Sequence, residues 1–305
     1  MASLVFATRP SALALWQTRW VMAALQAAHP GLICQEKVIV TQGDRILDKP
    51  LPEIGVKGLF TGELESDLLS GAVDCAVHSL KDLPVDDPAG LVLGCIPARG
   101  EVRDVLISAK GYSLSSLPEG AVVGTSSLRR AAQVLAARPD LRTRSLRGNV
   151  DTRLLKALEG QYDAIVLAGA GLTRLGLEAH VTEWLSLERM LPAPGQGALA
   201  VQCRAGDRAT LELLSALEDE PTRRAVSAER CFLLGLGGGC SLPVAAYACV
   251  GKDIHLDGLV AAPDGSQMVK LSATGGDAAG IGQHLADRAI ALGARALLSL
   301  LPAVS

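Results

Sequence analysis

Short apolar runs alternate with longer amphipathic segments along the first two-thirds of the chain. Residues 4–7 are apolar and predict a strand, and the apolar positions between Leu13 and Ala24 recur at the helical period. His29, Pro30 and Gly31 then end that helix. The same patterns predict further strands at 38–40, 75–77, 121–123 and 164–167, and further helices at 63–69 and 128–137. Strands that alternate with helices predict parallel sheets covered on both faces.

Two segments rich in proline and glycine, 97–100 and 192–197, interrupt this alternation and predict crossings between two lobes. After residue 221 the pattern changes to a helix, a glycine loop, two strands and a final helix, which predicts a small α+β domain. The predicted segments of that domain are 223–234, 245–250, 254–260 and 281–300. We therefore predict an α/β protein with the following parts: lobe 1 at 1–97 and 198–216, lobe 2 at 103–192, and a C-terminal domain at 220–305.

Polar residues follow three of the predicted strands directly. These segments are Thr8 to Ser11, His78 to Asp82, and Thr125 to Ser127. In open α/β sheets, ligands bind at the carboxyl ends of strands, where helix N-termini offer free N–H groups. Each hydroxyl could instead be a simple helix cap. Because each of the three segments also carries or adjoins a cation, we expect a cleft between the lobes for a polyanionic small molecule.

Seven arginines lie between Gly124 and Arg153 with only two acids, although the whole chain has 29 basic and 32 acidic residues. Guanidinium groups bind carboxylates or phosphates in a bidentate way. A solvated helix face is the alternative explanation for such a run. Arg138, outside the motifs described below, is expected on the polar side of its helix.

Asp82 and Cys240 are the two residues that suggest chemistry rather than binding. A carboxylate in an anion site opposes binding, so Asp82 indicates proton transfer or stabilisation of a cation, with a structural ion pair as the alternative. Cys240 follows three glycines, and its thiol is expected to be a nucleophile, a covalent tether or an incidental group.

Composition narrows the function further. A net charge of −3 and an aromatic content of 3% argue against nucleic-acid binding. No apolar run approaches the ~20 residues of a membrane span, and no export signal is recognisable, so we expect a cytoplasmic protein. The seven cysteines include no C-x-x-C pair and predict no metal site. Residues 195–200 fit G-x-G-x-x-A but follow no strand, which argues against a dinucleotide site.

Several long motifs occur in one order along nearly the whole chain, and they closely resemble the porphobilinogen deaminase family, also called the hydroxymethylbilane synthases. The matching segments are Ala7 to Arg9 with Ser11 to Gln17, Lys57 to Phe60, Val77 to Pro84, Gly124 to Arg130, Ser145 to Val150, Tyr162 to Ile165, Leu191 to Gly197, and Gly238 to Cys240 with Pro243.

This resemblance implies two lobes like those of the type II periplasmic binding proteins, with a third small domain. It implies an enzyme that joins four porphobilinogens head to tail with loss of ammonia and then frees hydroxymethylbilane by hydrolysis. Growth begins on a dipyrromethane cofactor held by a thioether, and Cys240 occupies the tether position. Asp82 matches the catalytic carboxylate.

The resemblance also implies the remaining site residues. The cofactor is expected to contact Ser79, Lys81, Thr125, Ser126, Ser127, Arg129, Arg130, Arg147 and Gly148. The substrate is expected to contact Arg9, Ser11, Arg147, Arg153, Arg174 and Gln196. Lys57 and Phe60 match the loop over the active site, where Glu53, Val56 and Gly62 depart from the usual family residues.

The family further implies a monomer without nucleic-acid or membrane partners. A small-molecule dicarboxylate-binding protein of the same lobed fold is the alternative, because a fold alone does not determine function.

Overall fold

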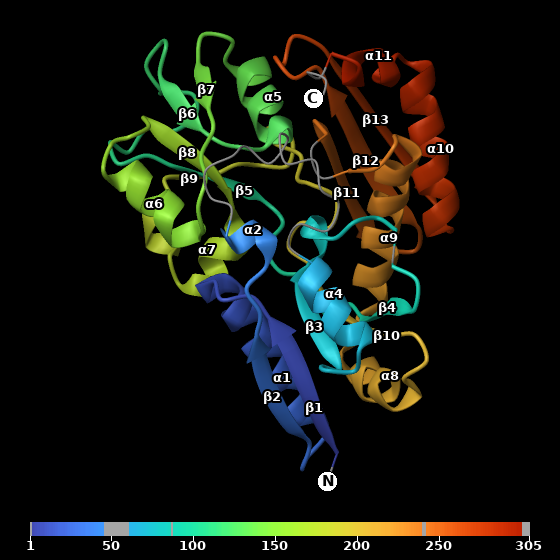
Figure 1. Ribbon diagram of the computed structural model, residues 1–305. Coiled ribbons are helices and arrows are strands. Elements are labelled where there is room, and N and C mark those ends of the chain that lie inside the picture. The colour runs from blue at the N-terminus through green and yellow to red at the C-terminus, as the bar shows by residue number, and fades with distance from the viewer. Residues whose placement is uncertain (1, 46–60, 87, 240–241, 301–305) are drawn as a thin grey trace. The chain divides into compact units, whose positions relative to one another are not determined.

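The computed structural model describes residues 2–45, 61–86, 88–239 and 242–300, which form two compact units (Figure 1). Unit 1 consists of the described residues within 1–48, 56–100 and 197–223, and unit 2 of those within 101–196 and 224–305. Within the described segments, no helix has both the length and the apolar character needed to cross a lipid bilayer.

Unit 1 is built on a five-stranded sheet with the order β2-β1-β3-β10-β4. Strands β2, β1 and β3 are parallel, whereas β10 is antiparallel to both of its neighbours. The apolar side chains alternate between the two faces: Phe6 packs with helix α1, and Ala7 packs with helix α4. The elements of this unit are β1 (Ser3–Thr8), α1 (Ala12–Ala28), β2 (Ile33–Val38), α2 (Gln42–Arg45), α4 (Gly62–Leu69), β3 (Cys75–Ser79), η1 (Leu80–Asp82), β4 (Leu91–Cys95), β10 (Leu199–Arg204), α8 (Arg208–Leu214) and η3 (Ser215–Leu217); α9 (Glu220–Gly235) begins here and continues into unit 2.

Unit 2 repeats this plan in a second five-stranded sheet, β7-β6-β8-β5-β9. Strands β7, β6 and β8 are parallel, and β5 is antiparallel to its neighbours, as β10 is in unit 1. Both antiparallel strands begin within a few residues of a chain crossing between the units. The elements are β5 (Asp104–Ile107), β6 (Val122–Gly124), α5 (Leu128–Ala137), β7 (Arg142–Arg144), α6 (Val150–Leu158), β8 (Ala164–Ala168), α7 (Gly169–Leu175), η2 (Glu178–His180) and β9 (Glu183–Trp184).

Unit 2 also contains a three-stranded antiparallel sheet, β11-β12-β13, covered by helices α9 and α10 (Figure 1). Gly258 of this sheet lies so close to Phe232 and Leu285 that a side chain there would collide with both. The opposite face packs against α5, where Ala132 is buried with Leu259 and other apolar residues. The remaining elements are β11 (Val244–Val250), β12 (Ile254–Ala261), β13 (Met268–Gly275), α10 (Ala278–Ala291) and α11 (Ala294–Leu298).

The predicted α/β class, with two sheet-containing lobes and a small C-terminal α+β part, is confirmed. The three sets of domain boundaries stay a prediction, because unit 2 holds both its five-stranded sheet and the C-terminal sheet.

Two local predictions were wrong. The strand expected at 38–40 is β2 at Ile33–Val38, an edge strand whose residues are mostly exposed and show no apolar alternation. The single final helix is two helices, α10 and α11, separated at Gly293, whose φ of 97° is left-handed. Arg138, predicted on the polar side of its helix, is the C-cap of α5, and it donates hydrogen bonds to the carbonyls of Leu114 and Leu117.

Candidate anion site

In unit 2, four strand ends lie at one edge of the sheet. Gly124 of β6 pairs with Arg144 of β7 and with Ile165 of β8, so the carboxyl ends of these parallel strands are neighbours. Asp104, the first residue of the antiparallel β5, pairs with Ala168 at the end of β8 and therefore lies at the same edge. The predicted cofactor ligands that follow β6 and β7 are thereby brought to one side of this unit.

Helix α5 opens at this edge with an arrangement suited to an anion. Ser127 is its N-cap, and its hydroxyl accepts a hydrogen bond from the Arg130 backbone N–H. Thr125 is buried, and its Oγ1 accepts from the Ser127 backbone N–H at 3.2 Å. The first turn of α5 contains no acid and two arginines, so positive side chains are added to the positive end of the helix dipole.

Ser126 joins the loops that follow β6 and β7. Its Oγ donates to the Leu146 carbonyl at 2.7 Å and accepts from the Leu146 N–H at 3.0 Å. Tyr162 holds the same loop through a hydrogen bond from its hydroxyl to the Ser145 carbonyl at 2.7 Å. Although Ser126 was predicted to contact the cofactor, its hydroxyl here fixes the position of the neighbouring loop.

Side chains of α6 hold the Arg147–Gly148 segment from its other side. Arg153 Nε donates to the Gly148 carbonyl at 2.7 Å, and Lys156 Nζ donates to the Arg147 carbonyl at 3.0 Å. Gly148 has a φ of 115°, and a Cβ there would lie 2.8 Å from Thr152. The loop is thus fixed by its own backbone conformation and by two cationic side chains, one of them the predicted substrate ligand Arg153.

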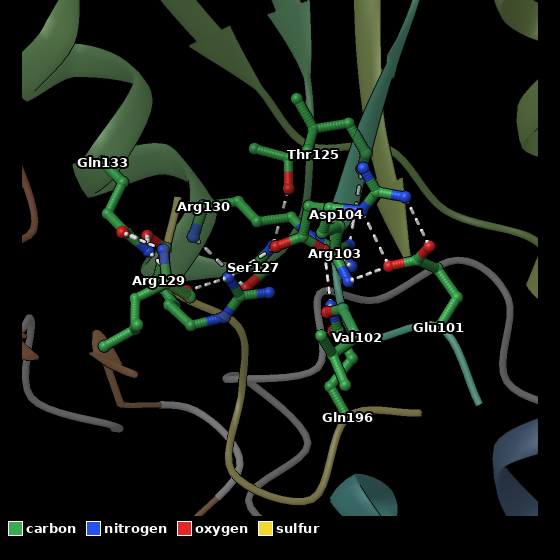
Figure 2. Close-up of polar contacts among 12 residues, drawn as sticks. Glu101, Val102, Arg103, Asp104, Thr125, Ser127, Arg129, Arg130, Gln133 and Gln196 are labelled. Atoms are coloured by element: carbon green, nitrogen blue, oxygen red, sulfur yellow. Dashed lines mark hydrogen bonds and ion pairs between the residues drawn. The ribbon is translucent and has the colours of Figure 1, made fainter. Parts of the chain in front are cut away.

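Arg129 and Arg130 meet a carboxylate that the sequence patterns did not indicate (Figure 2). Arg129 Nη1 donates to Asp104 Oδ2 at 2.7 Å, and Arg130 donates to Oδ1 from Nε at 3.0 Å and from Nη2 at 2.8 Å. All three residues are buried. Asp104 is separated from the arginines by about 25 residues and belongs to no spacing motif, so only the sheet topology could reveal this cluster.

Arg129, Arg130 and Asp104 together carry a net charge of +1, because two guanidinium groups pair with one carboxylate. Burial disfavours the charged form of Asp104, but Arg129 and Arg130 outweigh that cost and hold the pKa of its carboxyl well below the usual value. Burial lowers the pKa of Arg129, and Asp104 opposes this effect. Two guanidinium groups therefore share one carboxylate in a region almost closed to water. Among the described residues, Arg129 Nε is buried and has no hydrogen-bond partner.

Gln196, the predicted substrate ligand, is fully buried and completes this cluster. Its Nε2 donates to the Val102 carbonyl at 2.8 Å and to Asp104 Oδ1 at 2.9 Å (Figure 2). Gln133 holds the preceding segment, since its Oε1 accepts from the Leu191 N–H at 2.8 Å. Gln133, like Asp104, was absent from the predicted site.

Unit 1 carries a second polar edge, formed by the parallel strands β1 and β3. Ser79 lies at the end of β3, and its hydroxyl accepts from Gln17 Nε2 at 2.9 Å. Ser11 is the N-cap of α1 and accepts from the Ala14 N–H at 3.3 Å. Arg9 follows β1 and forms a two-fold ion pair with Asp44. Despite partial burial, the Arg9 and Thr41 hydrogen bonds lower the pKa of Asp44.

Lys81 and Asp82 form the short 3₁₀ turn η1 after β3. The Asp82 side chain is exposed and, within the described part of the chain, has no ion-pair or hydrogen-bond partner. This geometry argues against the structural ion pair that was the alternative for Asp82. Its assignment as the catalytic carboxylate stays a prediction.

His78, directly before this turn, is buried at the end of β3. Burial lowers the pKa of His78 to about 4, and nearby Arg9 acts in the same direction, whereas Gln202 opposes it. The imidazole is therefore neutral at pH 7 and adds no charge to this edge of unit 1.

Some predicted site residues fall outside the described residues or stand apart from the contacts above. Cys240, Lys57 and Phe60 lie outside the described residues, as do Glu53 and Val56, whereas Gly62 begins α4. Arg174 lies near the end of α7, the helix that follows β8, and burial lowers its pKa to about 10.

Two alternative sites have no support in the geometry. The residues of the G-x-G-x-x-A match run into strand β10 and open no helix, contrary to what a dinucleotide site requires. Among the described histidines, cysteines and acids, no group of three or more is arranged to hold a metal ion.

A two-unit α/β protein with hydroxyls, guanidinium groups and a helix N-terminus at its strand ends defines a class of small-anion-binding proteins. Within that class, the chain belongs to the porphobilinogen deaminase family. The family model "porphobilinogen deaminase, dipyromethane cofactor binding domain" matches residues 4–212, and the model of the family's C-terminal domain matches residues 223–291.

Similar proteins include the porphobilinogen deaminases of Brevibacillus brevis and Bacillus subtilis. The first is 52% identical over 294 residues, covering 96% of this chain and 95% of that protein. The second is 48% identical over 301 residues, covering 98% and 96%. Among solved structures, the BvgS periplasmic VFT2 domain of Bordetella pertussis is similar with a TM-score of 0.42 and 14% identity, covering 70% of this chain and 86% of that one.

Proposed function

We propose that this chain joins four porphobilinogens head to tail, releases one ammonia at each condensation, and frees hydroxymethylbilane by hydrolysis. The match of the cofactor-binding family model to residues 4–212 carries this proposal, because that segment contains the polar edges of both five-stranded sheets. Such an enzyme is a transferase of tetrapyrrole biosynthesis.

The residues present fit a dipyrromethane cofactor. Its acetate and propionate groups are carboxylates, and the α5 edge offers a net positive charge, a helix N-terminus and the buried, unpartnered Nε of Arg129 among the described residues. When bound, the cofactor would supply the free pyrrole carbon to which the first porphobilinogen is joined. Cys240 would hold it through a thioether, and Thr125, Ser127, Arg129, Arg130, Arg147 and Lys81 would bind its carboxylates.

Asp82 would stabilise the positive charge of the substrate. As the carbon–nitrogen bond to the aminomethyl group breaks and ammonia departs, positive charge develops on the pyrrole nitrogen. A new carbon–carbon bond then forms, and the attacked ring loses a proton. An exposed carboxylate without a cationic partner in the described part of the chain is suited to this role, because its charge is not already neutralised.

The family resemblance also leads us to propose a cytoplasmic monomer without a nucleic-acid partner. The dicarboxylate-binding alternative is not favoured, because curated relatives that cover nearly the whole chain are named porphobilinogen deaminase.

Intact-mass spectrometry of the purified protein tests the proposal directly. We expect the protein to exceed its sequence mass by one dipyrromethane unit, and brief incubation with porphobilinogen should add further single-pyrrole steps. Cys240→Ala should abolish both the added mass and the activity. Cys249→Ala, at an exposed position of β11, is the matched control and should retain both. Active protein of unmodified mass, or activity in Cys240→Ala, would exclude the assignment.

A further inference from the structure

Asp104 is a fully buried carboxylate that accepts hydrogen bonds from three side chains. It accepts one hydrogen bond from Arg129, two from Arg130 and one from Gln196, all between 2.7 and 3.0 Å. Figure 2 shows the three donor side chains converging on it. Since both oxygens are used, the direction of each guanidinium group is set by Asp104.

Fold stability alone does not account for this cluster. Burying charges carries a desolvation cost, and apolar residues of similar volume often stabilise a fold as well or better. The two arginines also occupy the first turn of α5, where the helix dipole disfavours cations. The arrangement is explained if the guanidinium groups must be held at this edge for a ligand.

Asp104 also determines which donors remain for that ligand. It binds Nη1 of Arg129, whose second partner is the Leu191 carbonyl, and it binds Nε and Nη2 of Arg130. Arg129 Nε is left buried and without a partner among the described residues. Without the carboxylate, two adjacent guanidinium groups would repel each other and adopt other rotamers.

We infer that Asp104 is a positioning residue that acts through Arg129 and Arg130, fixing the guanidinium groups that bind the carboxylates of the covalently attached primer. This inference rests on the proposed function. Gln196 contributes to the same positioning, because its amide donates a hydrogen bond to Asp104 from the segment that follows Leu191.

The central experiment compares Asp104→Asn with Asp163→Asn in the full-length protein. Asp163 is a carboxylate of the same unit that accepts a backbone hydrogen bond from Val122 at 2.8 Å and contacts neither arginine. We expect Asp104→Asn to lower kcat, per molecule that carries the dipyrromethane mass, roughly tenfold to a hundredfold. KM for porphobilinogen should stay within about twofold, since Asp104 does not hold the incoming substrate. Asp163→Asn should lower the unfolding temperature and leave kcat unchanged.

A double-variant comparison separates action through Arg130 from an independent effect. If Asp104 acts through that arginine, the loss of kcat in Asp104→Asn/Arg130→Gln should be smaller than the product of the two single losses, with a remainder from Arg129. The double variant removes one buried charge of each sign, so it also serves if Asp104→Asn does not fold.

The outcomes distinguish this inference from the proposed function. A kcat for Asp104→Asn equal to that of Asp163→Asn, or a double variant whose loss is the product of the two single losses, would overturn the positioning role alone. An unaltered protein that neither carries the dipyrromethane mass nor consumes porphobilinogen would overturn the proposed function and this inference with it.

Discussion

At the scale of single residues, burial decides which polar groups are charged and what they can bind. His78 and Asp104 are both buried, yet one is neutral and the other ionised, because only Asp104 has hydrogen-bond partners of opposite charge among the described residues. Asp82 differs from both, since its side chain is exposed to water.

Asp82→Asn should preserve porphobilinogen binding and remove nearly all turnover. The amide has the size of the carboxylate but carries no charge, so the barrier should rise by about 3–4 kcal/mol, roughly 10²–10³ in rate. Steady-state bilane formation measures this effect. Glu119→Gln, at an exposed carboxylate outside the site loops, is the control and should turn over normally. Near-normal bilane formation by Asp82→Asn would show that Asp82 is not the catalytic carboxylate.

His78 should make the free energy of unfolding depend on pH below neutrality. Its pKa is about 4 in the folded protein and near 6.5 when unfolded, so the unfolded state binds more protons between these values. The stabilisation is complete above pH 6.5 and is lost as pH falls towards 4, by on the order of 3 kcal/mol.

Urea titrations at pH 7 and pH 5 check this expectation. His78→Gln should lose less stability between the two pH values than the unaltered protein, because its side chain does not titrate. Asp104 does not contribute to the difference in stability between pH 7 and pH 5, because its lowered pKa affects the free energy of unfolding only below about pH 4. Equal losses in both proteins would contradict the assignment to His78.

At the scale of elements, α5 connects the anion site to the C-terminal sheet. Its N-terminal turn carries Arg129 and Arg130, and its middle packs against the turn between β12 and β13. A Cβ on Gly265 of that turn would lie 2.4 Å from the Ala132 carbonyl oxygen, and the φ of Gly265 is 72°. The backbone of the turn therefore touches the helix that presents the arginines.

Gly265→Ala should destabilise the protein more than Gly111→Ala. Both glycines have left-handed φ values, 72° and 74°, which cost an alanine about 1–2 kcal/mol. Gly111 has open space around it, whereas Gly265 faces backbone atoms of α5, so overpacking should add about 1–3 kcal/mol. Chemical denaturation measures the difference. If both variants lost the same free energy of unfolding, the result would contradict a close approach of Gly265 to α5.

The sequence predicts elements well where apolar periodicity is strong and less well where it is weak. The predicted helix at 128–137 agrees with α5, because its amphipathic pattern and its Ser127 cap indicate the same start. The strand predicted at 38–40 begins later than the observed edge strand β2 (Ile33–Val38), because most side chains of β2 are exposed and show no apolar alternation. Asp104 was missed because its partners are brought to it by the pairing of β5 with β8.

At the scale of the whole molecule, local and overall charge act in opposite directions. The net charge of −3 repels an anionic substrate, whereas the strand-end arginines attract it. A pair about 4 Å apart at an effective dielectric of 20 gains about 4 kcal/mol, while one charge about 20 Å away in water contributes about 0.2 kcal/mol. The local attraction therefore dominates.

Raising the salt concentration should consequently raise KM for porphobilinogen several-fold and leave kcat nearly constant. At 1 M salt the screening length falls to about 3 Å, which weakens attraction at the partly exposed guanidinium groups. Initial rates in NaCl, compared with a neutral osmolyte at equal viscosity, measure the effect. A KM that falls with salt would show that the net negative charge governs capture.

The position of β10 has a consequence for the order in which the chain becomes folded during synthesis. This strand, Leu199–Arg204, lies between β3 and β4, which are made more than a hundred residues earlier. The five-stranded sheet of unit 2, by contrast, takes all its strands from the continuous stretch between Asp104 and Trp184. The five-stranded sheet of unit 2 can therefore form completely on the ribosome before that of unit 1. Until β10 is made, β3 and β4 have unpaired edges with which other chains could pair. We therefore expect the unit that contains Asp82 to be the one exposed to such contacts until β10 has been made.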